Sequence, residues 1–199
     1  MIIRKMMNCK IEKQLLFNFF KAQGIIEEKN EYIEIIEEKN KNKPNTLKKL
    51  KIENLDSNNR YYKINPENPY IKPNKQTECV IIEYNEQSDF MNIVFVEMKP
   101  KKVKLHEVLK KFERTFSWLY LLFNLLNGKE GKEFRVYFLL CKYSNTQKND
   151  EVCKSKINIF HNLTVKYIRI TKHSNAKEEM DIDFRGLISI STEKRCGEE

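Results

Sequence analysis

Two apolar runs separated by a short polar segment constrain the fold of this chain more than any other feature. The runs, Cys79–Tyr84 and Asn92–Val96, are rich in β-branched and aromatic residues, which favour β-strands. The polar segment between them is short, so the pattern predicts an antiparallel hairpin. The chain is therefore expected to contain at least one pair of neighbouring, largely buried strands.

The second run continues into Glu97, Met98 and Lys99. Residues two apart in a strand project from the same face, so Glu97 and Lys99 are expected side by side, with Met98 on the other face. Paired residues of an antiparallel hairpin keep a constant index sum. With the turn centred near residues 87–88, position 97 faces position 78 or 79, which predicts that Glu78 lies beside Glu97.

The other acidic residues of this region are expected to be remote from that pair. Glu83 would face about position 92, roughly 15 Å along the ladder at about 3.3 Å per residue. Glu83, Glu86 and Asp89 are interpreted as solvated residues of the turn.

An acidic residue that opens one strand, followed by a second strand ending in Glu-x-Lys, resembles the PD-(D/E)xK restriction-endonuclease-like nucleases. The matching residues here are Glu78, Glu97 and Lys99. The predicted order β-β-α-β-α-β over about residues 77–171 is also similar to the core of that family. Two features depart from the family pattern: the first acid is Glu where Asp is usual, and Lys110-Lys111 stand in a helix where many members carry Gln or Glu.

The resemblance implies an α/β fold with a restriction-endonuclease-like mixed central sheet flanked by helices. It also implies metal-dependent hydrolysis of phosphodiester bonds, with DNA favoured over RNA as substrate, in restriction, repair or mobile-element defence. Glu78, Glu97 and the backbone carbonyl of Met98 would hold Mg²⁺ or Mn²⁺, which prefer oxygen ligands. Lys99 would position the attacking water or stabilise the charge that develops on the phosphate.

The charge balance favours a polyanionic partner. The chain has 37 basic and 28 acidic residues, a formal net charge of +9, which suits nucleic acid. The basic residues nearest the Glu-x-Lys motif are the expected phosphate contacts: Lys101, Lys102, Lys104, Lys110, Lys111 and Arg114. Two alternatives stay open, a catalytically inactive nucleic-acid- or protein-binding module of the same fold and an RNA nuclease.

The length of 199 residues suits a single domain. We divide it into an N-terminal helix and extension (1–76), a core (77–171) and a C-terminal segment (172–199). Apolar periodicity and turn residues predict two helices and a polar, helical stretch after residue 141. The remaining expected elements are listed by range: helices Cys9–Gln23 and Val103–Asn127, strands Tyr32–Ile36, Phe134–Cys141, Leu163–Thr171 and Asp181–Ser191, and a hairpin of Leu47–Leu55 with Arg60–Ile64.

Cysteine usage and hydropathy indicate a cytoplasmic location. The five cysteines form no Cys-x-x-Cys pair, as expected for buried, reduced thiols rather than a zinc site. No secretory signal pattern is evident, and the most apolar stretch, Phe116–Leu126, is too short to span a bilayer. We expect no membrane association, and the chain is compatible with a homodimer.

Overall fold

The computed structural model describes residues 18–37, 42–66, 76–85, 87–88, 90–99, 105–127, 133–143, 148–152, 165–175 and 177–188. These residues form a mixed α/β fold that is mostly strand. The strands are β1 (Ile26–Lys29), β2 (Ile33–Ile36), β3 (Lys49–Glu53), β4 (Arg60–Ile64), β5 (Cys79–Tyr84), β6 (Phe90–Lys99), β7 (Glu133–Tyr143), β8 (Lys148–Val152), β9 (Val165–Asn175) and β10 (Glu179–Asp183). The helices include α2 (Leu105–Asn127) and the short α3 (Phe184–Ile188).

The strands form two mixed sheets. A seven-stranded sheet has the order β1-β4-β5-β6-β7-β9-β8, and a three-stranded sheet has the order β10-β3-β2. In the large sheet, β1, β4, β5 and β6 pair antiparallel, β6, β7 and β9 pair parallel, and β8 pairs antiparallel with β9. The parallel step from β6 to β7 requires a crossover, and α2 is the helix that makes it.

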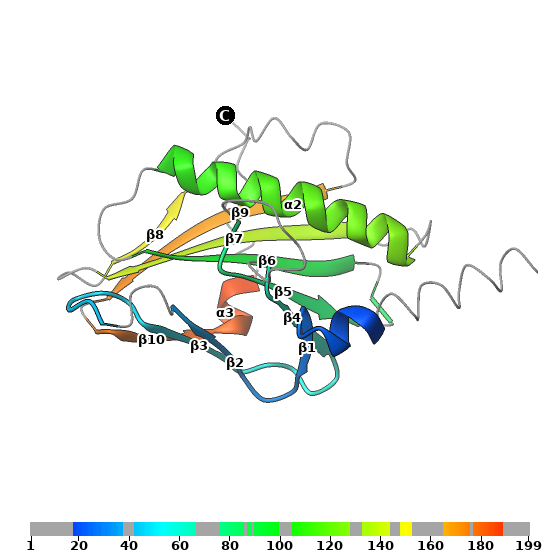
Figure 1. The fold of residues 1–199 in the computed structure, drawn as a ribbon, viewed down its shortest axis with the longest axis horizontal. Coiled ribbons are helices and arrows are strands. Elements are labelled where there is room, and N and C mark those ends of the chain that lie inside the picture. Colours follow the sequence, from blue (N-terminus) through cyan, green and yellow to red (C-terminus); the bar gives the residue numbers. More distant parts are fainter. Residues whose placement is uncertain are drawn as a thin grey trace, which may run out of the picture.

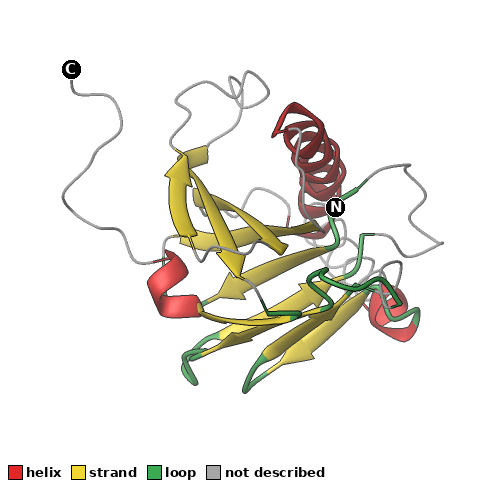
Figure 2. Ribbon diagram, turned by 90° about the vertical axis from the view of Figure 1, so that its left-hand side faces the viewer, coloured by secondary structure: helices red, strands yellow, loops and turns green. Residues whose placement is uncertain are grey.

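The elements stack in three layers. Helix α2 lies along one face of the large sheet, and the small sheet with α3 covers the other face (Figures 1 and 2). Two apolar clusters fill the spaces between the layers. The first joins α2 to the large sheet, and the second joins the large sheet to the small sheet and α3.

Strand β5 is apolar at nearly every position because both of its faces are covered. Val80 and Ile82 belong to the cluster under α2, whereas Cys79 and Ile81 belong to the cluster over the small sheet. The same two-sided burial holds for most of β6. A strand buried on both faces has a nearly continuous apolar sequence instead of an alternating one.

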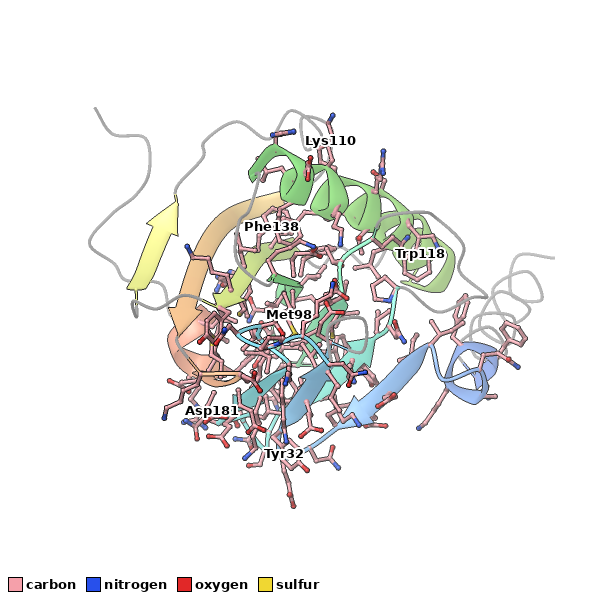
Figure 3. All side chains as sticks on the ribbon, turned by 60° about the vertical axis from the view of Figure 1, so that its left-hand side comes forward. Tyr32, Met98, Lys110, Trp118, Phe138 and Asp181 are labelled. Atoms are coloured by element: carbon pink, nitrogen blue, oxygen red, sulfur yellow. The ribbon has the colours of Figure 1, made fainter. Side chains whose placement is uncertain are left out.

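An aromatic cluster fixes α2 on the sheet. Phe95 lies with its ring centroid 6.5 Å from that of Phe112, 5.9 Å from that of Phe116 and 5.4 Å from that of Phe138. Phe112 and Phe138 stack at 4.6 Å. Figure 3 shows Phe138 between the helix and the sheet. These contacts determine which side of α2 faces strands β6 and β7.

The helical turn over residues 18–22 ends where the sequence predicts a stop. Gly24 has a φ of 65°, a left-handed conformation that glycine adopts readily. The amide of Gly24 donates to the carbonyl of Lys21, and the amide of Ile25 donates to the carbonyl of Phe20. This is the Schellman pattern of helix termination. The remainder of the helix expected at Cys9–Gln23 lies outside the described residues.

Several expected elements are confirmed, with shifted bounds. The hairpin is present as β5 and β6, and the helix expected at Val103–Asn127 is α2. The strands expected at Tyr32–Ile36, Phe134–Cys141 and Leu163–Thr171 correspond to β2, β7 and β9. The coarse prediction of a mixed α/β fold is also confirmed.

The hairpin expected from Leu47–Leu55 and Arg60–Ile64 is wrong. Both segments are strands, but β3 belongs to the small sheet and β4 to the large sheet. Leu50 and Ile52 of β3 and Tyr61 of β4 lie in the same apolar cluster. The two strands therefore lie in opposite layers. Their side chains pack together in the core, but their backbones do not form the hydrogen-bonded pair that was expected.

The polar stretch after β7 is not helical at Lys148–Val152, which forms the edge strand β8 beside β9. Pairing with the open sheet edge overrides the weak local preference of such a polar segment for a helix. Residues 153–164 lie outside the described part of the chain. Among the described residues, the order from β5 to β9 is therefore β-β-α-β-β-β, with a strand at Lys148–Val152 in the region where a helix was expected.

The last predicted strand is also shorter than expected. Strand β10 ends at Asp183, whose carboxylate accepts hydrogen bonds from the backbone amides of Arg185 at 3.3 Å and Gly186 at 2.9 Å. An aspartate in this position caps a helix N-terminus, so Phe184–Ile188 turns into α3. The large sheet is consequently flanked by α2 on one face and mainly by a second sheet on the other. Among the described helices, none is long and apolar enough to cross a membrane.

The buried cysteines lead to a first testable prediction. Burial raises the pKa of the Cys79 thiol to about 12, and it also raises the pKa of Cys141. Because the thiolate is the reactive form, we expect both residues to resist iodoacetamide at mildly alkaline pH in the native protein and to react once urea unfolds it. Peptide mass spectrometry would follow each cysteine separately. Rapid labelling of Cys79 in native protein would contradict this core placement.

Candidate active site

The β5–β6 ladder brings Glu78 and Glu97 to the same end of two neighbouring strands. Its last pairs are Val80 with Phe95 and Cys79 with Val96. Extending that register by one residue places Glu78 opposite Glu97, as the constant index sum predicts. Since Val80 and Phe95 pack under α2, residues 78 and 97 lie on the same side of the sheet, beneath the N-terminal half of this helix.

Glu97 is the centre of the site. Its side chain is 0% exposed, and two ammonium groups contact its Oε1 atom. Lys111 Nζ lies 2.6 Å from Oε1 and donates a hydrogen bond, and Lys99 Nζ makes a close ion pair with the same oxygen. The other oxygen, Oε2, is buried and has no hydrogen-bond partner among the described residues. Buried carboxylate oxygens normally have partners, so this oxygen has unused capacity to bind a ligand.

Lys111 also connects the two carboxylates. Its Nζ lies 3.7 Å from Glu78 Oε1 as well as 2.6 Å from Glu97 Oε1, so these two oxygens are no more than 6.3 Å apart. The side chains of Glu78 and Lys111 are 11% and 19% exposed, and that of Lys99 is 26% exposed. The cluster is therefore partly open to solvent around a fully buried carboxylate.

The carboxylates keep Lys111 charged. Burial works to lower the pKa of the Lys111 ammonium, but the neighbouring Glu97 carboxylate, with Glu78, outweighs it. The net pKa is raised above the ordinary value for lysine. Lys111 therefore carries a full positive charge at neutral pH, and the described cluster contains two carboxylates and two ammonium groups.

The donor set fits a hard divalent cation in part. Two facing carboxylates provide oxygen ligands, and Glu97 Oε2 is a buried oxygen without a partner in the described residues. Within those residues, however, no group of three or more His, Cys, Asp and Glu side chains could hold a metal ion. A cation here would depend on Glu78, Glu97 and non-carboxylate ligands such as water, a backbone carbonyl or phosphate.

The backbone of Met98 lies beside these carboxylates, and its side chain points to the opposite face. That side chain is buried in the cluster over the small sheet, and Figure 3 shows it between the two sheets. The residue pairs with Cys141 in the β6–β7 ladder. Its carbonyl as a metal ligand stays a prediction.

The residues predicted to contact phosphate separate into three groups. Lys110 and Arg114 are exposed on α2, and Lys110 points away from the sheet in Figure 3. Lys111 instead turns toward the sheet and contacts Glu97 and Glu78. Lys101, Lys102 and Lys104 lie outside the described residues. Lys111 therefore belongs to the centre of the site instead of its rim.

The expectation that Glu83 is a solvated turn residue is wrong. Glu83 is buried, and its Oε1 accepts hydrogen bonds from Tyr61 Oη at 2.6 Å and Asn59 Nδ2 at 2.8 Å. Its Oε2 accepts one from Asn92 Nδ2. Three donors compensate for the loss of hydration of this carboxylate. Glu83 lies at the other end of β5 from Glu78 and on the opposite face, so it forms a separate network. Glu86 and Asp89 lie outside the described residues.

Helical periodicity could have placed Lys111 on the buried face of α2, although it does not identify Glu97 as the partner. The buried face of α2 contains Val108, Phe112 and Thr115, and Lys111 is three residues after Val108 and four before Thr115. Residues at such spacing share a helix face. A lysine on the buried face of an amphipathic helix needs a carboxylate partner, and the end of the hairpin contains two.

Comparisons with known proteins add no assignment, because no family model, curated protein or solved structure matches this chain. The function is therefore inferred from the geometry of the site.

Proposed function

We propose that this chain is a metal-dependent nuclease that hydrolyses phosphodiester bonds, with DNA as the favoured substrate. The observation that supports the proposal most is the fully buried Glu97, which faces Glu78 at the end of the β5–β6 hairpin and has one oxygen without a partner among the described residues. We also propose that β5, β6, α2 and β7 form a core of the restriction-endonuclease-like type. The order of these elements, a hairpin followed by a crossover helix and a parallel strand, supports this part of the proposal.

Each residue of the cluster has a role in this proposal. Glu78 and Glu97, with the Met98 carbonyl, would hold Mg²⁺ or Mn²⁺, and the ion would supply Lewis-acid activation of the phosphate. Lys99, which is partly exposed and lies beside Glu97, would stabilise the negative charge that builds up on the phosphate in the transition state. Lys110 and Arg114, exposed on α2, would contact neighbouring phosphates without regard to base sequence.

One observation favours a second function. The two ammonium groups already neutralise the two carboxylates, as in a structural ion-pair cluster. A module with this arrangement and a net charge of +9 could bind nucleic acid without cutting it. Binding of this kind would weaken steeply with salt, with a log–log slope of about −0.9 per neutralised phosphate of duplex DNA.

A cleavage assay would test the nuclease proposal. The purified protein would be incubated with supercoiled plasmid, single-stranded DNA and RNA, each with Mg²⁺, Mn²⁺ or a chelator. We expect cleavage of DNA with a divalent ion and none with the chelator. Tight, salt-sensitive binding with no cleavage under any of these conditions would support the binding module instead. Cleavage of RNA alone would show that the substrate is RNA and not DNA.

A further inference from the structure

We infer that Lys111 is a built-in counter-ion that competes with a divalent cation for Glu97 and Glu78, so that cation binding depends on a phosphate group arriving with it. This inference deepens the proposed function and rests on it. It concerns the control of the site, whereas the proposed roles of Glu97 and Lys99 concern the reaction.

The position of Lys111 supports competition. One ammonium nitrogen contacts both carboxylates, at 2.6 Å from Glu97 Oε1 and 3.7 Å from Glu78 Oε1. A cation shared by these two carboxylates would lie close to the ammonium group that already contacts both of them. Even a cation held by Glu97 Oε2, which has no partner in the described part of the chain, would share a carboxylate with two ammonium groups.

The charge balance explains the dependence on phosphate. The cluster has two carboxylates and two ammonium groups, so its formal charge is zero before a cation enters. A divalent ion would add two positive charges beside a fully buried side chain, where water screens little of the repulsion. A phosphodiester contributes a negative charge that offsets part of this excess. By linkage, the phosphate then raises cation affinity and the cation raises phosphate affinity by the same factor.

The Lys111 side chain can move away from the carboxylates. Lys99 lies in the same strand as Glu97, two residues away on the same face, whereas Lys111 reaches the site from α2. A lysine side chain has several rotatable bonds, so its ammonium can leave the carboxylates without displacement of the helix. The phosphate of a bound nucleic acid would provide it with a new anionic partner.

Isothermal titration of the full-length protein with Mn²⁺ would test the competition. Lys111→Met removes the charge but keeps an unbranched side chain, and Lys43→Met makes the same change in net charge at an exposed position before β3, outside the site. We expect Lys111→Met to bind Mn²⁺ at least about tenfold more tightly than the wild type. Lys43→Met should behave as the wild type. Equal affinities in all three proteins, or no Mn²⁺ binding by any of them, would overturn the inference.

A second titration would test the link to phosphate. Ca²⁺ would be titrated into each protein with and without a short oligodeoxythymidylate. The oligonucleotide should raise the Ca²⁺ affinity of the wild type by about tenfold, and that of Lys111→Met by less. Equal enhancement in both proteins would contradict a coupling through Lys111. Circular dichroism would verify folding, and Lys111→Gln would replace the methionine variant if that variant does not fold.

The outcomes separate this inference from the nuclease proposal. Tighter Mn²⁺ binding by Lys111→Met in a protein that cuts no nucleic acid would support the counter-ion and reject the nuclease. Metal-dependent cleavage by a wild type whose Mn²⁺ affinity is unchanged by Lys111→Met would support the nuclease and reject the counter-ion.

Discussion

Replacement of Glu97 by alanine or glutamine is expected to lower metal-dependent cleavage of DNA by about 10²- to 10⁴-fold, the range typical of groups that act on a transition state. Glu97 is the fully buried carboxylate at the centre of the site, so its loss removes a cation ligand and leaves two ammonium groups without their shared partner. Lys99→Ala should reduce the rate by a similar factor while Mn²⁺ binding persists. Initial rates with Mg²⁺ and Mn²⁺, normalised to folded protein, would provide the measurement.

Glu83→Gln is a suitable control for the Glu97 variants. Glu83 is a second buried carboxylate of the same hairpin, but it is hydrogen-bonded to Tyr61, Asn59 and Asn92 in a separate network. Its replacement should lower stability and leave the cleavage rate per folded molecule within a few-fold of the wild type. If Glu97→Gln and Lys99→Ala both retain more than about a tenth of the wild-type rate, catalysis occurs elsewhere.

Phe95→Ala is expected to lower the free energy of unfolding by about 3–5 kcal/mol. Phe95 is fully buried and contacts the rings of Phe112, Phe116 and Phe138, so truncation leaves a cavity between α2 and the large sheet. Urea denaturation followed by circular dichroism would measure the change at a constant m-value.

Phe19→Ala provides the matched control, because the side chain of Phe19 is half exposed. Its free energy of unfolding should change by no more than about 1 kcal/mol. A loss below about 1.5 kcal/mol for Phe95→Ala would show that the aromatic cluster does not hold the helix against the sheet. Since α2 also contains Lys111, we expect Phe95→Ala to disturb the position of Lys111 in the site as well as to lower the stability of the fold.

The parts of the site that lie within one hairpin could be predicted from the sequence. Antiparallel pairing places Glu78 opposite Glu97 through the constant index sum. The alternation of side chains along a strand places Glu97 and Lys99 on one face and Met98 on the other. Both rules are local, and the observed ladder follows them. The crossover helix α2 was also predictable, because its apolar positions recur at helical spacing.

The parts that depend on distant segments could not be predicted. Lys111 reaches Glu97 only because the aromatic cluster sets the rotation of α2 on the sheet. Strands β3 and β4 are neighbours in sequence, yet they join different sheets because β10 provides a partner for β3. Strand β8 forms because β9 offers an open edge. The burial of Glu83 requires Tyr61 and Asn59 from another strand and its adjoining loop. No local pattern contains these partners.

The parallel pairing of β10 with β3 has a consequence for the order of folding. Strand β10 meets β3 in register from Glu179 with Lys49 to Asp183 with Glu53, so most of the chain separates two strands that are adjacent in the small sheet. Contacts of such high sequence separation form slowly. During synthesis on the ribosome, β3 would emerge long before β10, and its residues Leu50 and Ile52 would lack one of the two strands that pair with β3. The small sheet is therefore the part of this molecule whose completion must wait for the arrival of its C-terminal segment.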